Sequence, residues 1–247
     1  MSAEIISFPN IFYFRELPDL SAKNCGERLA DLTLKRIVDI VLATVLLILA
    51  SPLIALAMLL IRIESKGQAI FAQERVGAKY QKKDGQIIWK VCLFRCYKLR
   101  TMRNDSNPEI HREYLLRFRN GLTDLGPKRA PYKLDRDPRI TRIGHWLRSA
   151  SLDELPQLLN VIKGDMSLVG PRPVPVYEIE LYDEPHFNRL AARPGITGLW
   201  QVYGRSRVTF EEMIEMDIEY ARHSCLWCDL KLLLLTVGSV VSRKGAA

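Results

Sequence analysis

The sequence lacks the short motifs that identify the common nucleotide-binding and metal-dependent enzymes. It has no Walker A loop, no Gly-x-Gly-x-x-Gly and no His-Glu-x-x-His. Its four histidines, at positions 111, 145, 186 and 223, show no metal-ligand spacing. A nucleotide, if one binds, is therefore not held by a P-loop or a Rossmann turn, and hydride transfer and zinc catalysis are excluded.

Cysteine, glycine and proline are also scarce. Five cysteines, an odd number, do not suit a disulfide framework and indicate a reducing compartment. Cys225 and Cys228 form a Cys-x-x-Cys without a redox or zinc context, so we interpret both as ordinary buried thiols. With 48% hydrophobic residues, 14 Gly and 13 Pro in 247 residues, a disordered chain and a fibrous one are excluded. One domain with appendages is predicted.

The excess positive charge is confined to one part of the chain. Between Arg95 and Arg148 there are 14 Lys or Arg against 6 Asp or Glu, which accounts for the whole net charge of +8. Such a segment predicts an anionic partner, either a phosphate, a nucleic acid or a lipid surface.

The strongest physical signal is an uncharged run of 22 residues from Ile40 to Ile61. A helix of that length reaches about 33 Å, enough to cross a bilayer core. Ser51-Pro52 in its middle predicts a bend, because proline removes a backbone N–H and clashes with the preceding turn. Basic residues flank the run on both sides: Lys35, Arg36, Arg62 and Lys66. Positive flanks favour the cytoplasmic side, so a single crossing and a re-entrant hairpin both stay open.

The rest of the chain divides around this run. We expect an N-terminal extension with little fixed structure over 1–33, a membrane segment over 34–66 and a catalytic domain over 67–247. A small β-hairpin is predicted near the membrane, with strands at Ala69–Phe71 and Ile87–Phe94 and a turn at Asp84-Gly85. A polar insertion is expected over about 103–135. Helices are predicted at Glu109–Phe118, Ile143–Arg148, Leu152–Ile162, Glu178–Ala192 and Phe210–His223.

Candidate chemistry begins at the segment Ser151-Leu152-Asp153-Glu154-Leu155-Pro156. One interpretation is a capping box, in which Ser151 caps a helix and Glu154 reaches back to it. The other is catalytic: two adjacent carboxylates, Asp153 and Glu154, hold Mg²⁺ and present one oxygen as a nucleophile. The two interpretations are compatible.

Basic residues that could contact a phosphate lie on both sides of this segment. Lys98 precedes it in Tyr-Lys-Leu-Arg-Thr-Met, and Arg148 stands three residues before Ser151. Arg172 follows in a Gly-Pro-Arg-Pro loop, which fixes it rigidly. A solvated basic face is the alternative for each of them.

Taken together, these segments resemble the bacterial monotopic phosphoglycosyl transferases, the initiating sugar transferases of exopolysaccharide, capsule and glycan synthesis. The resemblance spans about residues 35–240, in the family's order, and the block from Arg148 to Pro173 is the most specific part. The matching stretches are KRIVDIVLATVLLILASPLIAL, IFAQERVG, YKLRTM, RSASLDELPQLLNVIKGDMSLVGPRP, RPGITGLWQVYGR and MDIEYA.

The resemblance implies transfer of a sugar 1-phosphate from a UDP-sugar to undecaprenyl phosphate, with release of UMP. Asp153 would be the nucleophile that forms a phosphosugar-enzyme intermediate, Glu154 would support it, and Mg²⁺ would sit at this pair. The resemblance assigns further substrate-binding positions to Lys98, Arg148, Arg172, Arg205 and Asp217. The sugar itself is not determined, although the loop WQVYGRS is closest to members that transfer hexose 1-phosphates.

The resemblance also implies the architecture. It predicts a predominantly helical α+β fold with a re-entrant helix-break-helix hinged at Ser51 and Pro52, on the bacterial inner membrane with the active site at its cytoplasmic face. The implied partners are the UDP-sugar, undecaprenyl phosphate and membrane lipid, and no nucleic acid; a homodimer stays open. The competing hypothesis is a non-catalytic, membrane-anchored basic domain that binds nucleic acid or anionic lipid, in which Asp153 and Glu154 only cap a helix.

Overall fold

The computed structural model describes residues 15–103, 109–120, 137, 139–204 and 208–241. Within them the fold is mixed helix and strand, with helices predominant, as the sequence predicts. The helices are α1 (Cys25–Glu64), α2 (Glu109–Arg119), α3 (Arg142–Ser149), α4 (Gln157–Lys163), α5 (Leu199–Tyr203), α6 (Phe210–His223) and α7 (Leu226–Val241), with 3₁₀ turns η2 (Leu152–Glu154), η3 (Val176–Leu181) and η4 (Glu184–Leu190). The strands are β1 (Glu16–Pro18), β2 (Ile70–Lys83), β3 (Gln86–Leu99), β4 (Ser167–Val169), β5 (Val174–Pro175) and β6 (Gly195–Thr197).

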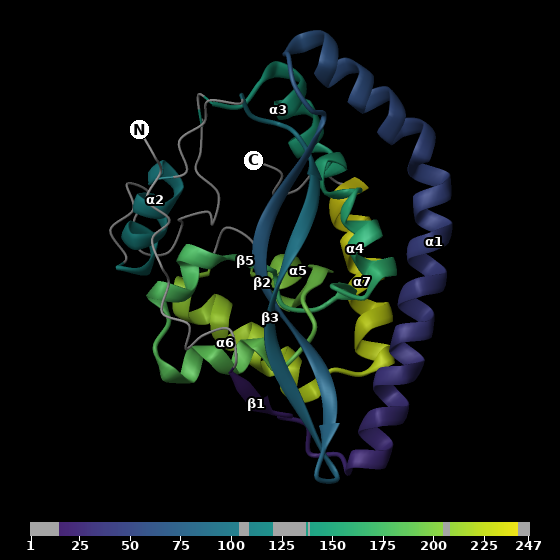
Figure 1. Cartoon of the computed structure of the whole chain (residues 1–247), viewed down its shortest axis with the longest axis vertical. Coiled ribbons are helices and arrows are strands. Elements are labelled where there is room, and N and C mark those ends of the chain that lie inside the picture. Colours follow the sequence, from purple (N-terminus) through teal and green to yellow (C-terminus); the bar gives the residue numbers. More distant parts are fainter. Residues whose placement is uncertain (1–14, 104–108, 121–136, 138, 205–207, 242–247) are drawn as a thin grey trace.

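A single helix of 40 residues, α1, contains the whole apolar run. It begins where the Asn24 side chain accepts a hydrogen bond from the Glu27 N–H at 2.9 Å. Figure 1 shows it running along one side of the molecule and curving over one end. The helix therefore starts nine residues before the predicted boundary at 34, and the predicted extension is structured from residue 15 as β1 and the first turns of α1. Residues 1–14 of that extension lie outside the described residues.

The expected break at Ser51-Pro52 is not present, because α1 continues through Pro52. Proline at position 52 cannot donate a hydrogen bond to the carbonyl of Ile48, four residues earlier. The Ser51 hydroxyl donates to that carbonyl instead, at 2.8 Å. The hydroxyl thus satisfies the acceptor that the proline leaves free, and the helix curves rather than ends.

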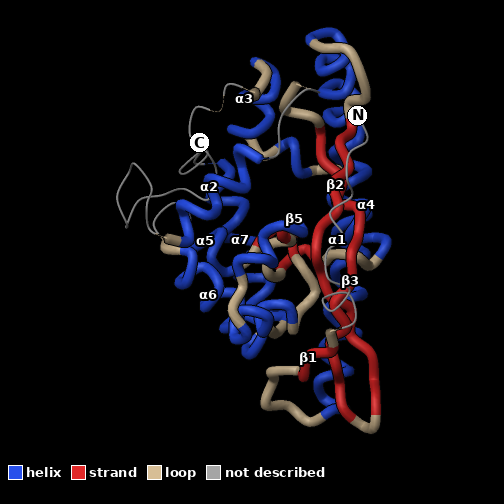
Figure 2. The backbone as a smooth tube through the Cα atoms, turned by 60° about the vertical axis from the view of Figure 1, so that its left-hand side comes forward, coloured by secondary structure: helices blue, strands red, loops and turns tan. Residues whose placement is uncertain are grey.

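Strands β2 and β3 form a long antiparallel pair joined at Asp84-Gly85. Both turn residues have positive φ, 51° and 77°, as a two-residue type I′ turn requires. Each strand has 14 residues, so the pair is much longer than the short stretches predicted. Alternate residues of β3 from Ile87 to Val91 are buried, which fixes this face against the core. Figure 2 shows the turn end of the pair, with β1 beside it, near one end of the molecule.

The remaining strands add to the β2–β3 pair or form a second sheet. The larger sheet has the order β1-β3-β2-β5, and β4 pairs with β6 in a second, parallel sheet of two strands. In Figure 1 the long strands lie between α1 on one side and α2 and α6 on the other.

Both halves of α1 pack on the folded domain. Leu32, near its start, belongs to the core that contains Trp89. Ala57 and Ile61, near its end, pack with Leu147 of α3 in a separate cluster. Each of these aliphatic side chains is less than a tenth exposed, and full burial of a leucine or isoleucine contributes about 1.5–3 kcal/mol. The domain therefore holds the helix at both ends.

Two local predictions are wrong. The single helix predicted over Glu178–Ala192 is instead two 3₁₀ turns, η3 and η4. Pro185 at the start of η4 explains the interruption, since proline ends a preceding helix and begins the next. Cys228, interpreted as buried, is exposed at the start of α7, because nothing in the described domain covers that side of the first turn.

Candidate active site

The two carboxylates Asp153 and Glu154 lie on a tight turn between α3 and α4. Ser151, just before them, has φ 55° and ψ 20°, a left-handed conformation that is uncommon for a residue other than glycine. No side-chain cap forms at Ser151, and α4 begins only at Gln157. The predicted capping box and the continuous helix from Leu152 are therefore wrong. Strained backbone of this kind costs about 1–3 kcal/mol and persists where the surroundings over-determine it.

Glu154 is held between two cations from different parts of the chain. Its Oε1 atom accepts hydrogen bonds from Lys98 Nζ at 3.1 Å and from Arg172 Nη2 at 3.2 Å. Lys98 stands near the end of β3, and Arg172 lies in the loop between β4 and β5. All three side chains are at most a fifth exposed, so solvent screens these charge-assisted contacts only weakly.

Arg148 is the third basic group beside Asp153 and Glu154. Its Nε donates to Thr101 Oγ1 at 2.9 Å, which ties the end of α3 to the residues after β3. Burial lowers the pKa of Arg148, and the charge of Asp153 acts in the opposite direction. Arg148 is thus a half-buried cation, and the carboxylate of Asp153, the predicted nucleophile, is the charge that most favours its protonated form.

The position of α3 depends on two close contacts. A Cβ atom at Gly144 would overlap the carbonyl of Thr101, so only glycine lets the helix approach this closely. At the start of α3, the Glu64 carboxylate accepts hydrogen bonds from the N–H groups of Arg142 at 2.8 Å and Ile143 at 3.2 Å. The last residue of α1 therefore helps to place the helix that carries Arg148.

Asn160 joins α4, which follows the two carboxylates, to the strand that carries Lys98. Its side chain is fully buried. It donates to the carbonyl of Arg95 at 2.7 Å and accepts from the N–H of Tyr97 at 3.0 Å. These two bonds use both polar atoms of the amide and fix β3 against α4, next to Glu154.

Asp217 is placed behind the site rather than among the groups that meet Glu154. It is fully buried on α6 and forms an ion pair with Arg189. The pKa of Asp217 is raised to about 6, because the effect of burial exceeds the opposing effect of the Arg189 guanidinium. Arg189 also donates to the carbonyl of Arg172 at 3.5 Å. In this location the Asp217–Arg189 pair can hold the loop that carries Arg172. The contact between Asp217 and substrate stays a prediction. Arg205, also predicted to bind substrate, lies outside the described residues.

Three further residues near the site were missed by the sequence reasoning. Arg75 donates to the carbonyl of Pro173 at 3.2 Å, directly beside Arg172. Tyr177, on η3, interacts with His111 of α2 at 2.7 Å. The pKa of His111 is lowered to about 4, chiefly by burial and in addition by nearby arginines, Arg75 first among them. Only Arg75 had a sequence signal, as part of the segment IFAQERVG; the other two come together only in the fold.

The donor set is compatible with Mg²⁺ at an open site. Among the residues that the structure describes, no group of three or more His, Cys, Asp or Glu could enclose a metal ion. Mg²⁺ is commonly bound by one or two carboxylates, with water and substrate phosphates as the remaining ligands. Asp153 and Glu154 supply such a pair, with the rest left to substrate and water.

Comparison with known sequences identifies the family of the chain. The sequence model of a family described as bacterial sugar transferase matches residues 30–243. The exopolysaccharide production protein ExoY of Rhizobium meliloti is 39% identical over 212 residues, which are 86% of this chain and 87% of ExoY. The undecaprenyl-phosphate galactose phosphotransferase of Salmonella typhimurium is 41% identical over 213 residues, 86% of this chain and 41% of that protein.

A third relative, the UDP-glucose:undecaprenyl-phosphate glucose-1-phosphate transferase of Escherichia coli, is 39% identical over 221 residues, 86% of this chain and 41% of that protein. The galactosyl transferase CpsE of Streptococcus agalactiae is matched over only 36% of its length. The chain thus spans most of ExoY and less than half of the other three. The match over residues 30–243 places the chain in the bacterial sugar transferase family.

Proposed function

We propose that the protein transfers a sugar 1-phosphate from a UDP-sugar to undecaprenyl phosphate through a covalent intermediate on Asp153. The observation that carries the proposal is the clamp of Lys98 and Arg172 on Glu154, beside the buried Asp153. The activities by which the Salmonella and Escherichia relatives are named support undecaprenyl phosphate as the acceptor and a UDP-sugar as the donor. The step belongs to the first membrane stage of exopolysaccharide or glycan synthesis.

In the first half-reaction, a carboxylate oxygen of Asp153 attacks the phosphorus that bears the sugar. A new O–P bond forms while the bond to the bridging oxygen of the diphosphate breaks, and UMP leaves with that oxygen. In the second half-reaction, a phosphate oxygen of undecaprenyl phosphate attacks the same phosphorus and frees the carboxylate. The product is an undecaprenyl diphosphate sugar. Splitting one transfer into two steps is the usual advantage of a covalent intermediate.

The chain's own groups meet the charge requirements of both steps. Lys98, Arg148 and Arg172 offer three cations around one turn, where the transferred phosphoryl oxygens carry negative charge. Glu154 holds Lys98 and Arg172 in place until substrate arrives. Mg²⁺ bound at the carboxylates would neutralise charge on the diphosphate.

The packing of α1 supports a re-entrant arrangement on the cytoplasmic face of the inner membrane. The same domain contacts Leu32 before the apolar run and Ile61 at its end, so both ends lie on one side of any bilayer that it enters. Between them α1 exposes apolar side chains, with Ile48 66% and Leu49 72% exposed. Helix α7 adds further exposed apolar side chains, Trp227 and Leu234. Such an apolar surface marks a membrane contact.

The non-catalytic alternative is weakened by how the basic segment is used. Within its described part, Arg112 pairs with Glu180, Arg119 with Asp183 and Arg139 with Asp137. These arginines stabilise contacts within the protein instead of forming a free basic surface for nucleic acid.

The direct test measures UMP release by the detergent-solubilised protein, given Mg²⁺, undecaprenyl phosphate and a panel of UDP-sugars. We expect lipid-dependent UMP release from one sugar, its loss in Asp153→Asn and its loss on chelation of the metal. Asp165→Asn is the matched control, because the Asp165 carboxylate pairs with the exposed Lys79 on β2. Full activity of Asp153→Asn would remove the proposed nucleophile.

The re-entrant arrangement is tested by substituted cysteines at Lys23→Cys and Lys66→Cys, placed one at a time in a chain without its native cysteines. In sealed inverted membrane vesicles, an impermeant maleimide should label both positions from the outside. Labelling of only one position would indicate a helix that crosses the membrane.

A further inference from the structure

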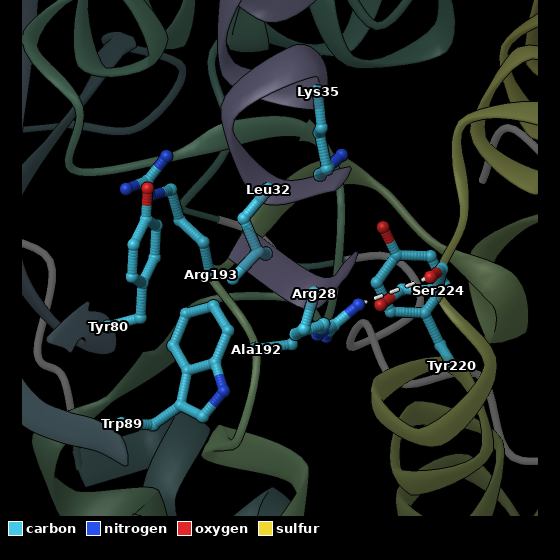
Figure 3. Close-up of a pocket in the computed structure, with 9 residues that line it drawn as sticks. All are labelled: Arg28, Leu32, Lys35, Tyr80, Trp89, Ala192, Arg193, Tyr220 and Ser224. Atoms are coloured by element: carbon cyan, nitrogen blue, oxygen red, sulfur yellow. Dashed lines mark hydrogen bonds between the residues drawn. The ribbon is translucent and has the colours of Figure 1, made fainter. Parts of the chain in front are cut away.

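A second basic site lies far from Asp153, between the start of α1 and the turn half of the β2–β3 pair. It is a pocket with about 350 Å³ of empty space, including its open mouth. Figure 3 shows side chains from α1, both long strands, the loop before β6 and the end of α6 around it. The lining residues are Arg28, Leu32, Lys35, Tyr80, Trp89, Ala192, Arg193, Tyr220 and Ser224.

The charged residues of this wall all carry the same sign. Three are cations, Arg28, Lys35 and Arg193, and none is an aspartate or glutamate. Lys35 is paired at a distance of 2.5 Å with Asp229, outside the lining. For Arg193, no carboxylate within the described part of the chain lies within ion-pair distance, and its guanidinium stands 5.7 Å from the ring centre of Tyr80. The wall therefore offers hydrogen-bond donors and positive charge.

Two arginines, the buried Arg28 and the half-buried Arg193, each have a buried nitrogen atom without a hydrogen-bond partner here. Arg28 is 2% exposed; its Nε donates to Asp19 at 3.1 Å and its Nη1 to the carbonyl of Ser224 at 3.3 Å. Its Nη2 has no hydrogen-bond acceptor, and neither has Nε of Arg193. A buried charged donor without a partner is costly, and its presence indicates a ligand or water that accepts the bond.

The position of the pocket separates it from the catalytic groups. Trp89 of the pocket and Lys98 of the active site are nine residues apart on β3, which corresponds to about 30 Å along a strand. On α1, Lys35 stands between Leu34 and Ile37, which are 49% and 55% exposed. The pocket thus lies at the polar end of the apolar surface of α1, where lipid headgroups would be found.

We propose that this pocket binds a phosphate group, as a site separate from Asp153 and Glu154. Phosphate oxygens accept hydrogen bonds from arginine in fixed geometry. Arg28 is already paired with Asp19, and Lys35 with Asp229 and Asp39. A monoester or diester would therefore be held by the nitrogen atoms of Arg28 and Arg193 that have no acceptor and by the charge of Arg193. The bound phosphate would join Arg28 of α1 to Arg193 of the loop before β6. Its source is either the headgroup of an anionic lipid or a free phosphate.

The experiment measures binding of inorganic phosphate to the full chain in uncharged detergent by isothermal titration calorimetry. It is done in the Arg172→Gln background, so that phosphate binding at the catalytic turn is weakened. Adding Arg193→Gln should raise the Kd about tenfold or more, because a charge-assisted donor is lost. Lys79→Gln is the matched control, since Lys79 is an exposed cation on β2 that does not line the pocket.

A second arm uses flotation with vesicles of phosphatidylcholine alone or with one fifth phosphatidylglycerol. Loss of phosphatidylglycerol-dependent binding in Arg193→Gln, but not in Lys79→Gln, identifies a lipid phosphate; an effect confined to calorimetry identifies free phosphate. Arg193→Lys keeps the charge but loses the Nε donor, so it should bind more weakly than the parent and more tightly than Arg193→Gln, which separates loss of charge from misfolding. Equal binding of Arg193→Gln and Lys79→Gln in both arms, or no binding by the parent chain, overturns the proposal.

Discussion

The hydroxyl of Ser51 donates a hydrogen bond to the carbonyl of Ile48, the acceptor that Pro52 leaves without its usual partner. Within a membrane segment an unsatisfied carbonyl is expensive, since no water is available to replace the lost donor. One side-chain bond therefore keeps α1 helical across a proline. The curvature lets both ends of the helix reach the same domain.

This relationship predicts a dependence between Ser51 and Pro52. Ser51→Ala should lower the free energy of unfolding by about 1 kcal/mol while Pro52 is present. In the Pro52→Ala background the same change should cost little, because the restored N–H at position 52 donates to Ile48. A double-mutant cycle by thermal unfolding in detergent measures the coupling. Equal costs in both backgrounds would contradict the assigned role of the hydroxyl.

The clamp on Glu154 predicts strongly coupled losses of activity. Lys98→Gln and Arg172→Gln should each lower the rate of UMP release about 100-fold, as removal of one group that stabilises transition-state charge commonly does. The double variant should lose less than the product of the two, because both cations contact the same carboxylate oxygen. Lys90→Gln is the control, since Lys90 is an exposed lysine on the same strand. Independent, multiplicative losses would argue against a shared clamp.

Asn160 should affect both stability and catalysis. Asn160→Ala removes two buried hydrogen bonds and should lower the free energy of unfolding by about 2–3 kcal/mol. Asn160→Asp keeps an acceptor for the Tyr97 N–H but sets a buried carboxylate oxygen against the carbonyl of Arg95, so its UMP release should fall at least as far as that of Asn160→Ala. Chemical denaturation and initial rates measure the two effects.

The control for the two Asn160 variants is Asn188→Ala, because the half-buried Asn188 makes no side-chain hydrogen bond within the described part of the chain. It should leave both quantities close to those of the parent. If Asn160→Ala behaved in the same way, β3 would not depend on Asn160 for its position.

His111 predicts how stability depends on pH. The folded protein lowers the pKa of His111 to about 4, chiefly through burial, from an ordinary value of 6.5. As the pH falls below 6.5 the unfolded chain binds a proton before the folded one, so stability is lost from pH 6.5 down to about 4. Between pH 7 and pH 5 this single group should remove about 2 kcal/mol.

The measurement compares urea denaturation at the two pH values for the parent and His111→Gln. The variant should lose about 2 kcal/mol less than the parent, while His145→Gln, at an exposed histidine, should match the parent. A pH dependence unchanged by His111→Gln would show that His111 is accessible to protons in the folded state.

The local parts of the fold could be predicted from sequence. Asp84-Gly85 identified the turn, because few residues other than glycine accept its positive φ, and the β-prone stretches on either side of it identified parts of the two strands. Helix α3 was predicted from its periodicity. The length of β2 was not, since part of that strand pairs with β5, which is about 100 residues away in the sequence.

The sequence could indicate which residues belong to the candidate site, but not how they are arranged in space. Asp153 and Glu154 came from their adjacency and from the family resemblance, yet the capping box at Ser151 was wrong. The left-handed backbone at that residue, between α3 and η2, is not apparent from local spacing. The roles of His111 and Tyr177 were missed, because the two residues are 66 positions apart.

The sequence by itself determined the apolar run of α1, the turn of the long strand pair and the identity of the two carboxylates. These depend on chemistry within a few residues: side-chain polarity, the φ preference of glycine and the charge of neighbouring groups. Only the tertiary structure decided that Lys98 and Arg172 share one oxygen of Glu154, that Arg28 and Arg193 face one pocket, and that α1 continues through Pro52. The first two depend on which distant segments pack together, and the third on whether the carbonyl of Ile48 finds another donor.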